Sequence, residues 1–439
     1  MKIKILSILC LALALSSCKK GSEDLMIDGK MPELRSQESL KTYSEALTSA
    51  KNGWAAYLFT EGGGGYGFYM DFNDQDRVKM LAEIDAGTAT NLMESTYRLK
   101  AVMGPSLLFD TYNYLHLLAD PNEDVIGGTS GVGFKSDFEF EFSAIKGDTI
   151  KLVGKKRRSD LFLLKLNAEQ QDFYLKGGLK PLTAGLTNYF NVNKNLYITG
   201  NNEISKIQFS VNMALNVKKA FFTWVENGLV KTAEAPFAYT TNGMFFNKPL
   251  VFNDIAFKTI TWDKTKNQLI ATTTTGKQIE ILRGDLPIIP LHILMGTDRF
   301  KSITVFSTPY QTWSPGFVDM RATMVKTLAL NTRKLGNINF VFNAETKEMK
   351  ILVTTIRSIL PTVSEFVYSY TKTIDGTYDF EFVNTEERTA VILNTVLPLT
   401  KIFADHKFRL DYKLDPVQGQ VGSIASLDDP NFYTTGELK

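Results

Sequence analysis

The sequence contains little cysteine, little histidine and almost no net charge. Two cysteines among 439 residues exclude a disulfide scaffold. The three histidines, His116, His292 and His406, stand far apart, and without an H-E-x-x-H pattern they predict no zinc site. Lysine and arginine together number 49 against 47 acidic residues, so there is no basic field of the kind that attracts nucleic acid. We therefore expect no metal, no cofactor and no nucleic-acid partner.

The remaining composition is that of an ordinary globular protein, with 44% apolar and 22% charged residues, and the length exceeds that of one typical domain. No P-loop G-K-[ST] and no G-x-S-x-G nucleophile elbow occurs. Gly62, Gly64 and Gly67 match G-x-G-x-x-G, but a helix is predicted before them and a strand after, which is the reverse of a dinucleotide site. The absence of a catalytic motif favours a binding or scaffolding role over an enzyme.

The first residues predict an export signal. Lys2 and Lys4 precede an apolar run from Ile5 to Leu15, which is too short to span a bilayer and suits the core of a secretory signal. The run ends in Leu15-Ser16-Ser17-Cys18, which resembles the lipobox of bacterial lipoprotein precursors. The resemblance implies cleavage before Cys18, attachment of a diacylglyceryl group to its sulfur and acylation of its new amino group. The alternative is a plain signal peptide in which the cysteine is incidental.

The residues after Cys18 predict where such a lipoprotein would be sent. Position Lys19 is not the Asp that retains lipoproteins in the inner membrane of enteric bacteria. A tether that begins with lysines and continues with acidic residues, as Lys19 to Asp24 does, resembles those of Bacteroidetes lipoproteins exported to the outer face of the outer membrane. We expect a lipid-anchored, surface-exposed protein of the outer membrane, with a periplasm-facing anchor as the alternative. Multiple acyl chains would hold it firmly.

Residue periodicity predicts a mainly β protein, of β-rich α+β class. Apolar residues at Leu40, Tyr43, Leu47, Ala50 and Trp54 share one face of a helix predicted over 32–52. Alternating apolar and polar residues then dominate, with short turns and few helical spacers. This pattern indicates antiparallel meander sheets that form barrel-like or sandwich-like units, each accompanied by a short helical segment.

The same pattern suggests five segments along the chain. We expect a signal peptide at 1–17 and a lipidated, flexible tether at 18–31. A helix with an antiparallel β unit follows at 32–166, and a helical segment with a second β unit at 167–285. A C-terminal β-rich unit is expected at 286–439, in which β alternation runs from Ile338 to Leu414.

Three residues are candidates for ligand binding. Trp313 lies between Gln311-Thr312 and Ser314-Pro315-Gly316, a composition typical of a loop, where an indole can stack on a sugar ring. His116 falls in an apolar run that predicts a strand, and its simplest role is that of a hydrogen-bonded core or rim histidine. Asp110 lies close to it in sequence, and a catalytic triad assembled from loops around Asp110 and His116 needs no sequence pattern.

Several stretches resemble an uncharacterised family of Bacteroidetes lipoproteins. These are Asn52-Gly53-Trp54, Gly65-Tyr66, Phe72, Val78-Lys79-Met80, Ser95-Thr96-Tyr97, Leu108 to Asn113, His116 and Asp137 to Phe140. Members of that family often stand beside SusC/SusD-type nutrient-uptake systems and predicted surface metallopeptidases. The family has no established activity, so no catalytic residue is carried over.

The resemblance implies an accessory role at the cell surface. We expect binding or scaffolding during uptake of peptide or glycan material, with a SusC/SusD-type transporter or a surface peptidase as partner. One alternative is a surface hydrolase with a loop-assembled active site. The other is a structural subunit of an outer-membrane complex, which a large exposed apolar patch would favour.

Overall fold

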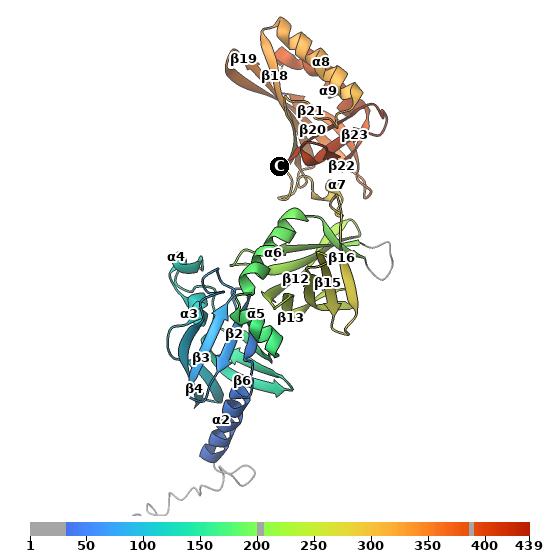
Figure 1. Cartoon of the computed structure of the whole chain (residues 1–439). Coiled ribbons are helices and arrows are strands. Elements are labelled where there is room, and N and C mark those ends of the chain that lie inside the picture. Colours follow the sequence, from blue (N-terminus) through green and yellow to red (C-terminus); the bar gives the residue numbers. More distant parts are fainter. Residues whose placement is uncertain (1–31, 200–205, 386–389) are drawn as a thin grey trace, which may run out of the picture. The chain divides into compact units, whose positions relative to one another are not determined.

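The computed structural model describes residues 32–199, 206–385 and 390–439, and within these ranges the chain folds into three closed antiparallel barrels of eight strands each (Figure 1). This confirms the expected mainly β class, and of the two closures considered it is the barrel that occurs. The expected signal peptide, Cys18 and the tether lie outside the described residues. Among the residues described, no helix is long and apolar enough to cross a membrane.

The first barrel follows helix α2 (Pro32–Thr48). Its strands are β1 (Trp54–Phe59), β2 (Gly65–Phe72), β3 (Arg77–Ala82), β4 (Met93–Ala101), β5 (Pro105–Phe109), β6 (Glu139–Lys146), β7 (Thr149–Gly154) and β8 (Asp160–Lys165). Two short helices, α3 (Tyr114–Ala119) and α4 (Glu123–Ile126), interrupt the meander between β5 and β6. The barrel closes where β1 pairs with β8, so that Trp54 lies opposite Lys165.

The second barrel follows helices α5 (Ala168–Leu175) and α6 (Leu179–Val192). Its strands are β9 (Leu196–Thr199), β10 (Lys206–Asn212), β11 (Lys219–Glu226), β12 (Leu229–Tyr239), β13 (Gly243–Phe252), β14 (Ile255–Asp263), β15 (Gln268–Thr273) and β16 (Gln278–Arg283). Pairing of β16 with β9 closes it.

The third barrel begins after the short helix α7 (Leu291–Leu294). Its strands are β17 (Ser302–Val305), β18 (Arg333–Asn343), β19 (Glu348–Arg357), β20 (Leu360–Lys372), β21 (Thr377–Thr385), β22 (Lys407–Asp415), β23 (Gly419–Ser426) and β24 (Tyr433–Leu438). Helix α8 (Pro315–Leu330) follows β17, and α9 (Ala390–Asp405) joins β21 to β22. The two helices lie against each other (Figure 1).

Contacts divide the chain into two compact units. The first contains the residues up to Leu186 together with Met213–Lys219 and Pro236–Asn247. The second contains Thr187–Asn212, Ala220–Ala235 and Lys248–Lys439. The first unit therefore holds the whole first barrel, and the second unit holds the whole third barrel.

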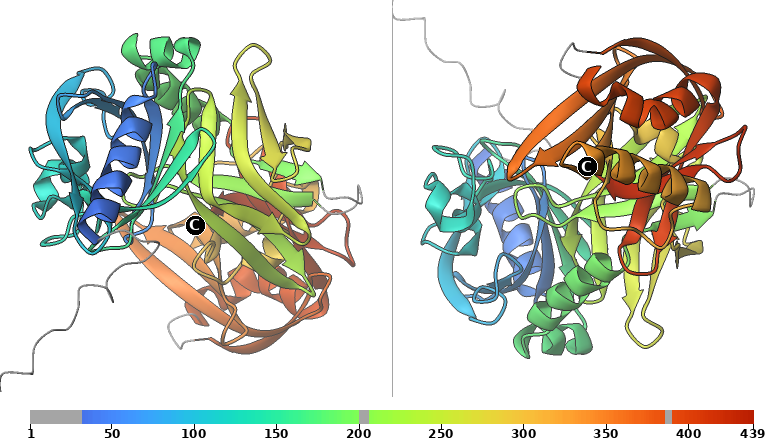
Figure 2. Two further views of the ribbon diagram at one scale, coloured as in Figure 1. Left: turned by 90° about the horizontal axis from the view of Figure 1, so that it is seen from below. Right: turned by 90° about the horizontal axis from the view of Figure 1, so that it is seen from above.

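The core of the first barrel consists of the inward-facing residues of its strands and one side of each of two helices. Helix α2 packs against β2, β4 and β5 (Figure 2), and its Tyr43 stacks on Phe142 of β6 at a ring distance of 4.0 Å. Helix α3 contributes Leu115 and Leu118, both fully buried. Because the alternation of the strands leaves every second side chain inside, the barrel is filled rather than hollow.

Two sequence-based expectations about local structure were wrong. Trp54 does not continue the first helix, which ends at Thr48. It begins β1, and its indole Nε1 donates back to the carbonyl of Leu47 at 2.9 Å, so its side chain joins the core that the apolar face of the helix contacts although its backbone is a strand. His116 lies in α3 rather than in a strand, because Asn113 caps that helix and directs the chain out of the β pattern.

Candidate functional site

Three rings stack in a row on the surface of the first barrel. The ring centroids of Tyr112 and His116 lie 5.6 Å apart at 29°, and those of His116 and Phe138 lie 4.5 Å apart at 22°. Tyr112 is 56% exposed and Phe138 is 37% exposed. We call these three residues the aromatic row. Because the rings stack face to face, His116 is covered on both faces, and the outer faces of Tyr112 and Phe138 are the ones that stacking leaves free. Stacking has already restricted these side chains, so a ligand that packs on them costs little further conformational entropy.

Asn113, the N-cap residue of α3, holds the ring of His116 at the centre of the row. Asn113 is fully buried, its Nδ2 donates to Ser95 Oγ at 3.1 Å, and its Oδ1 accepts the N–H of Leu115 at 3.0 Å. The Nδ1 atom of His116 lies 3.0 Å from Asn113 Oδ1 and 3.3 Å from Asn113 N. The cap therefore engages Nδ1, and Nε2 is the ring nitrogen that the cap does not use.

His116 is half-buried between its two aromatic neighbours. Burial lowers the pKa of His116 below its ordinary value of 6.5, because the charged imidazolium loses hydration there. The ring is therefore neutral at neutral pH. A neutral imidazole offers hydrogen-bonding capacity without charge, which suits an uncharged polar ligand.

Asp110 lies in the loop that leads into the row, but its carboxylate does not face His116. Both of its oxygens accept hydrogen bonds from the guanidinium of Arg98 on β4, and this pairing raises the pKa of Arg98. The backbone N–H of Asp110 donates to the carbonyl of Thr96 at 3.1 Å. Asp110 therefore anchors the loop to the sheet. Since Nδ1 of His116 is engaged by Asn113, the two residues do not form the Asp–His pair that a triad requires.

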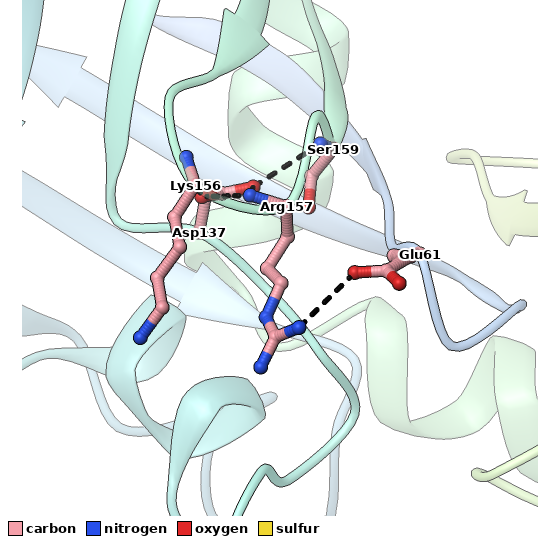
Figure 3. Close-up of polar contacts among 5 residues, drawn as sticks. All are labelled: Glu61, Asp137, Lys156, Arg157 and Ser159. Carbon is pink, nitrogen blue, oxygen red and sulfur yellow. Dashed lines mark hydrogen bonds and ion pairs between the residues drawn. The ribbon is translucent and has the colours of Figure 1, made fainter.

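A buried carboxylate lies directly beside the row in the chain. Asp137 is 4% exposed, and its Oδ1 accepts the backbone N–H groups of Lys156 and Arg157, both at 2.9 Å (Figure 3). Its Oδ2 accepts the N–H of Ser159 at 3.1 Å. The space around it is tight, because a Cβ added to Gly154 would collide with the Asp137 carboxylate. Asp137 therefore holds the turn between β7 and β8 in one conformation.

That turn carries four consecutive cations, Lys155 to Arg158, which we call the basic turn. Lys155 Nζ donates to the carbonyl of Val102 at 2.7 Å, and the guanidinium of Arg157 lies 3.4 Å from Glu61 Oε2. Lys156 and Arg158 are exposed. Figure 3 shows the side chains of Lys156 and Arg157 extending in the same direction from the turn. Because Phe138 directly follows Asp137, the aromatic row and the basic turn share a support.

The third candidate, Trp313, is a core residue. It is 7% exposed and its indole Nε1 donates to the carbonyl of Thr435 at 2.9 Å. The expectation of an exposed loop was wrong because Ser314 and Pro315 start helix α8 instead of a loop. The ring of Tyr310 stacks on Trp313 at 6.2 Å and 24°.

Sequence reasoning therefore found one member of the row and missed two. Tyr112 and Phe138 carried a signal, since they lie within the Leu108 to Asn113 and Asp137 to Phe140 stretches, but their exposure depends on how α3 packs on the barrel. Cys18 lies outside the described residues. In the described ranges no three His, Cys, Asp or Glu side chains gather as metal ligands.

Comparison with known proteins gives a family but no activity. The model of the family described as domain of unknown function (DUF4302) matches residues 29–264, which include the entire first barrel and extend through β14. No curated protein matches the chain. The match covers more than half of the sequence and leaves the third barrel outside it. The chain belongs to the DUF4302 family.

Proposed function

We propose that this protein binds glycans at the bacterial cell surface, and that the aromatic row is where it binds them. The observation that carries the proposal is the stacked, exposed arrangement of Tyr112, His116 and Phe138. One face of a sugar ring consists of C–H groups, which pack favourably on the electron-rich face of an aromatic ring. Its hydroxyl groups need polar partners, and Nε2 of His116 is one.

The row favours a glycan over a peptide for a geometrical reason. A peptide is held in an apolar groove or along a free sheet edge. The first barrel is closed, so β1 to β8 leave no unpaired edge for strand addition. The end rings of the row, Tyr112 and Phe138, are exposed, and the outer face of each can take the C–H face of one sugar ring.

The basic turn extends this proposal to acidic glycans. Lys156 and Arg158 are exposed close to Phe138 in the fold, since Asp137 binds the turn and precedes Phe138. A carboxylate or sulfate on a neighbouring sugar would form an ion pair with Lys156 or Arg158. The turn is held by a buried carboxylate, so its cations are presented without a large entropic cost.

The protein would act while anchored through Cys18 to the outer membrane, as the lipobox predicts. There it would present glycans to a SusC/SusD-type transporter of a Bacteroidetes cell, or work beside a surface peptidase. Radiolabelled palmitate should enter the wild-type protein and should not enter Cys18→Ala. Equal labelling of the two would remove the anchor from the proposal and leave the binding site untouched.

Binding itself is tested with the soluble chain from residue 25 onward against a panel of neutral and acidic oligosaccharides, by isothermal titration calorimetry. We expect Tyr112→Ala and Phe138→Ala each to weaken binding by about tenfold or more, which corresponds to about 1.4 kcal/mol per ring. Phe382→Ala is the matched control, because Phe382 is 41% exposed in the third barrel. Binding that no substitution in the row alters would overturn the proposal.

The hydrolase alternative has no support from the described geometry. Asp110 pairs with Arg98, and Asn113 engages Nδ1 of His116. Incubation of the wild-type chain with the same oligosaccharides, followed by product analysis, distinguishes binding from cleavage.

A further inference from the structure

The third barrel contains an open hollow of about 470 Å³, which none of the residues of the aromatic row line. Its lining comes from the segment after β17 (Phe306 to Tyr310), from Gln418 in the turn between β22 and β23, from Gln420 at the start of β23 and from Glu437 of β24. Every one of these residues belongs to the second unit and lies beyond residue 264, where the family match ends. The volume falls in the range of small-molecule sites.

One wall of the hollow is aromatic and rigidly supported. Tyr310 stacks on Trp313, which is buried and fixed through its indole nitrogen to the carbonyl of Thr435. The guanidinium of Arg321 lies over the Trp313 ring, 5.4 Å from its centre. Phe306 forms a second ring on the same wall, with the ammonium of Lys439 5.2 Å from its centre. A tyrosine backed by a buried tryptophan offers a fixed apolar surface to a ligand.

Polar side chains line the rest of the hollow. Gln418 presents a side-chain amide that can donate and accept, and Gln420, whose Oε1 accepts from Asn195 Nδ2 at 3.4 Å, adds an amide N–H group that can donate. Glu437 adds a carboxylate, which pairs with Lys439 Nζ at 3.1 Å. A ligand with adjacent hydroxyl groups could form hydrogen bonds with these side chains, because a hydroxyl also donates and accepts.

A single buried carboxylate joins the aromatic segment to the turn that carries Gln418. Asp415 is 3% exposed; its Oδ1 accepts the N–H groups of Val417 and Gln418, both at 3.0 Å. Its Oδ2 accepts the hydroxyl of Thr312 at 2.9 Å, next to Trp313. Burial would raise the pKa of Asp415, but these hydrogen bonds outweigh it and the pKa lies below its ordinary value. The turn and the aromatic segment are therefore joined before any ligand arrives.

We propose that this hollow, the barrel-three pocket, is a separate binding site for a neutral saccharide. One sugar face packs on Tyr310 and Phe306, and its hydroxyl groups meet the amides of Gln418 and Gln420. A neutral ligand is favoured because the charged groups at the rim, Glu437 and Lys439, already neutralise each other. The site shares no residue with the aromatic row, so either can fail without the other.

The test uses the chain from residue 25 to 439 with neutral disaccharides as probes, namely maltose, cellobiose, xylobiose and mannobiose, followed by saturation-transfer NMR and calorimetry. We expect Tyr310→Ala and Gln418→Ala each to weaken binding about tenfold. Val417→Ala is the matched control, because this side chain is 70% exposed on the same turn. Tyr112→Ala and Phe138→Ala should leave this binding unchanged, which separates the pocket from the row.

Thermal unfolding of each variant shows whether the variant is still folded at the temperature at which binding is measured. Gln420→Ala provides a second polar variant, since it removes an exposed amide without touching the Trp313 support. The proposal is wrong if no neutral disaccharide binds, or if binding is the same in Tyr310→Ala, Gln420→Ala and Val417→Ala while all three remain folded.

Discussion

Lys218 forms an ion pair with Glu83 in the interior of the first unit, where water reaches neither side chain. The side chains are 2% and 0% exposed. The second carboxylate oxygen of Glu83 accepts the N–H of Tyr239 at 2.8 Å, and the Lys218 ammonium lies 4.3 Å from the centre of the Tyr239 ring. Burial raises the pKa of Glu83 and lowers that of Lys218, while each charge stabilises the other. The pair joins the end of β3 to the segments before β11 and at the end of β12.

Removing one member of this pair should be strongly destabilising. Lys218→Met leaves Glu83 buried without its counter-ion, and we expect the free energy of unfolding to fall by about 3–5 kcal/mol, as measured by urea denaturation. The double variant Glu83→Gln with Lys218→Met should recover part of this loss, because a neutral amide can still accept the N–H of Tyr239. A loss of less than about 1 kcal/mol in Lys218→Met would show that water reaches Glu83.

Asp137→Asn should loosen the basic turn. An amide offers one acceptor oxygen where the carboxylate offers two, so the N–H of either Lys156 or Ser159 loses its partner. The N–H of Arg157 lies 2.9 Å from Oδ1 and 3.1 Å from Oδ2, so it keeps one acceptor in either orientation. We expect a loss of about 1–3 kcal/mol in the free energy of unfolding and faster amide exchange at 156–159. Glu139→Gln is the control, since Glu139 is the exposed first residue of β6, two positions after Asp137. This substitution should change the free energy of unfolding by less than about 0.5 kcal/mol. Equal effects of the two would contradict the role given to Asp137.

The stability of the first barrel should depend on pH through His116. The folded-state pKa of His116 lies below 6.5 because the ring is half-buried, so the unfolded chain takes up the proton first as the pH falls. Its contribution to stability is therefore complete above the unfolded-state pKa and is lost as the pH falls toward the folded-state value. We expect the melting temperature of the wild type to fall more between about pH 7 and about pH 5 than that of His116→Gln. Gln cannot titrate but can still take part in the cap. If the melting temperatures of the two proteins changed equally with pH, His116 would not be the group that makes stability depend on pH.

The strands were predictable from sequence, but the closure of the barrels was not. Alternation along β6 and β18 gives each strand an inner and an outer face, and this is local information. The pairing of Trp54 with Lys165 joins residues far apart in the chain, and no periodicity reports it. Lys218 gave no signal either, because a lysine in a short connection is normally exposed.

Helix α9 was missed for a physical reason. β alternation was expected through this region, and Pro398 lies in the middle of the segment, where proline normally ends a helix. Phe403 and Leu399 are nevertheless fully buried, so tertiary packing of the apolar face outweighs the cost of the proline. Trp313 shows the same limit: Ser314-Pro315 fits a loop and a helix start equally well, and only the fold decides.

Phe403 should be the most sensitive position on α9. Its ring stacks on Phe408 of β22 at 4.3 Å and 5°, and it also meets Phe340 at 5.3 Å and Phe380 at 5.6 Å. Phe403→Ala would leave a cavity that the surrounding rigid strands cannot fill, and we expect the free energy of unfolding to fall by about 3–5 kcal/mol. Leu397→Ala on the same helix is the matched control: Leu397 is 49% exposed, so its loss should cost less than about 1 kcal/mol. Because neither residue lines the barrel-three pocket, disaccharide binding measured well below the melting temperature should survive in both variants. If Phe403→Ala proved as stable as Leu397→Ala, α9 would not be docked on this barrel.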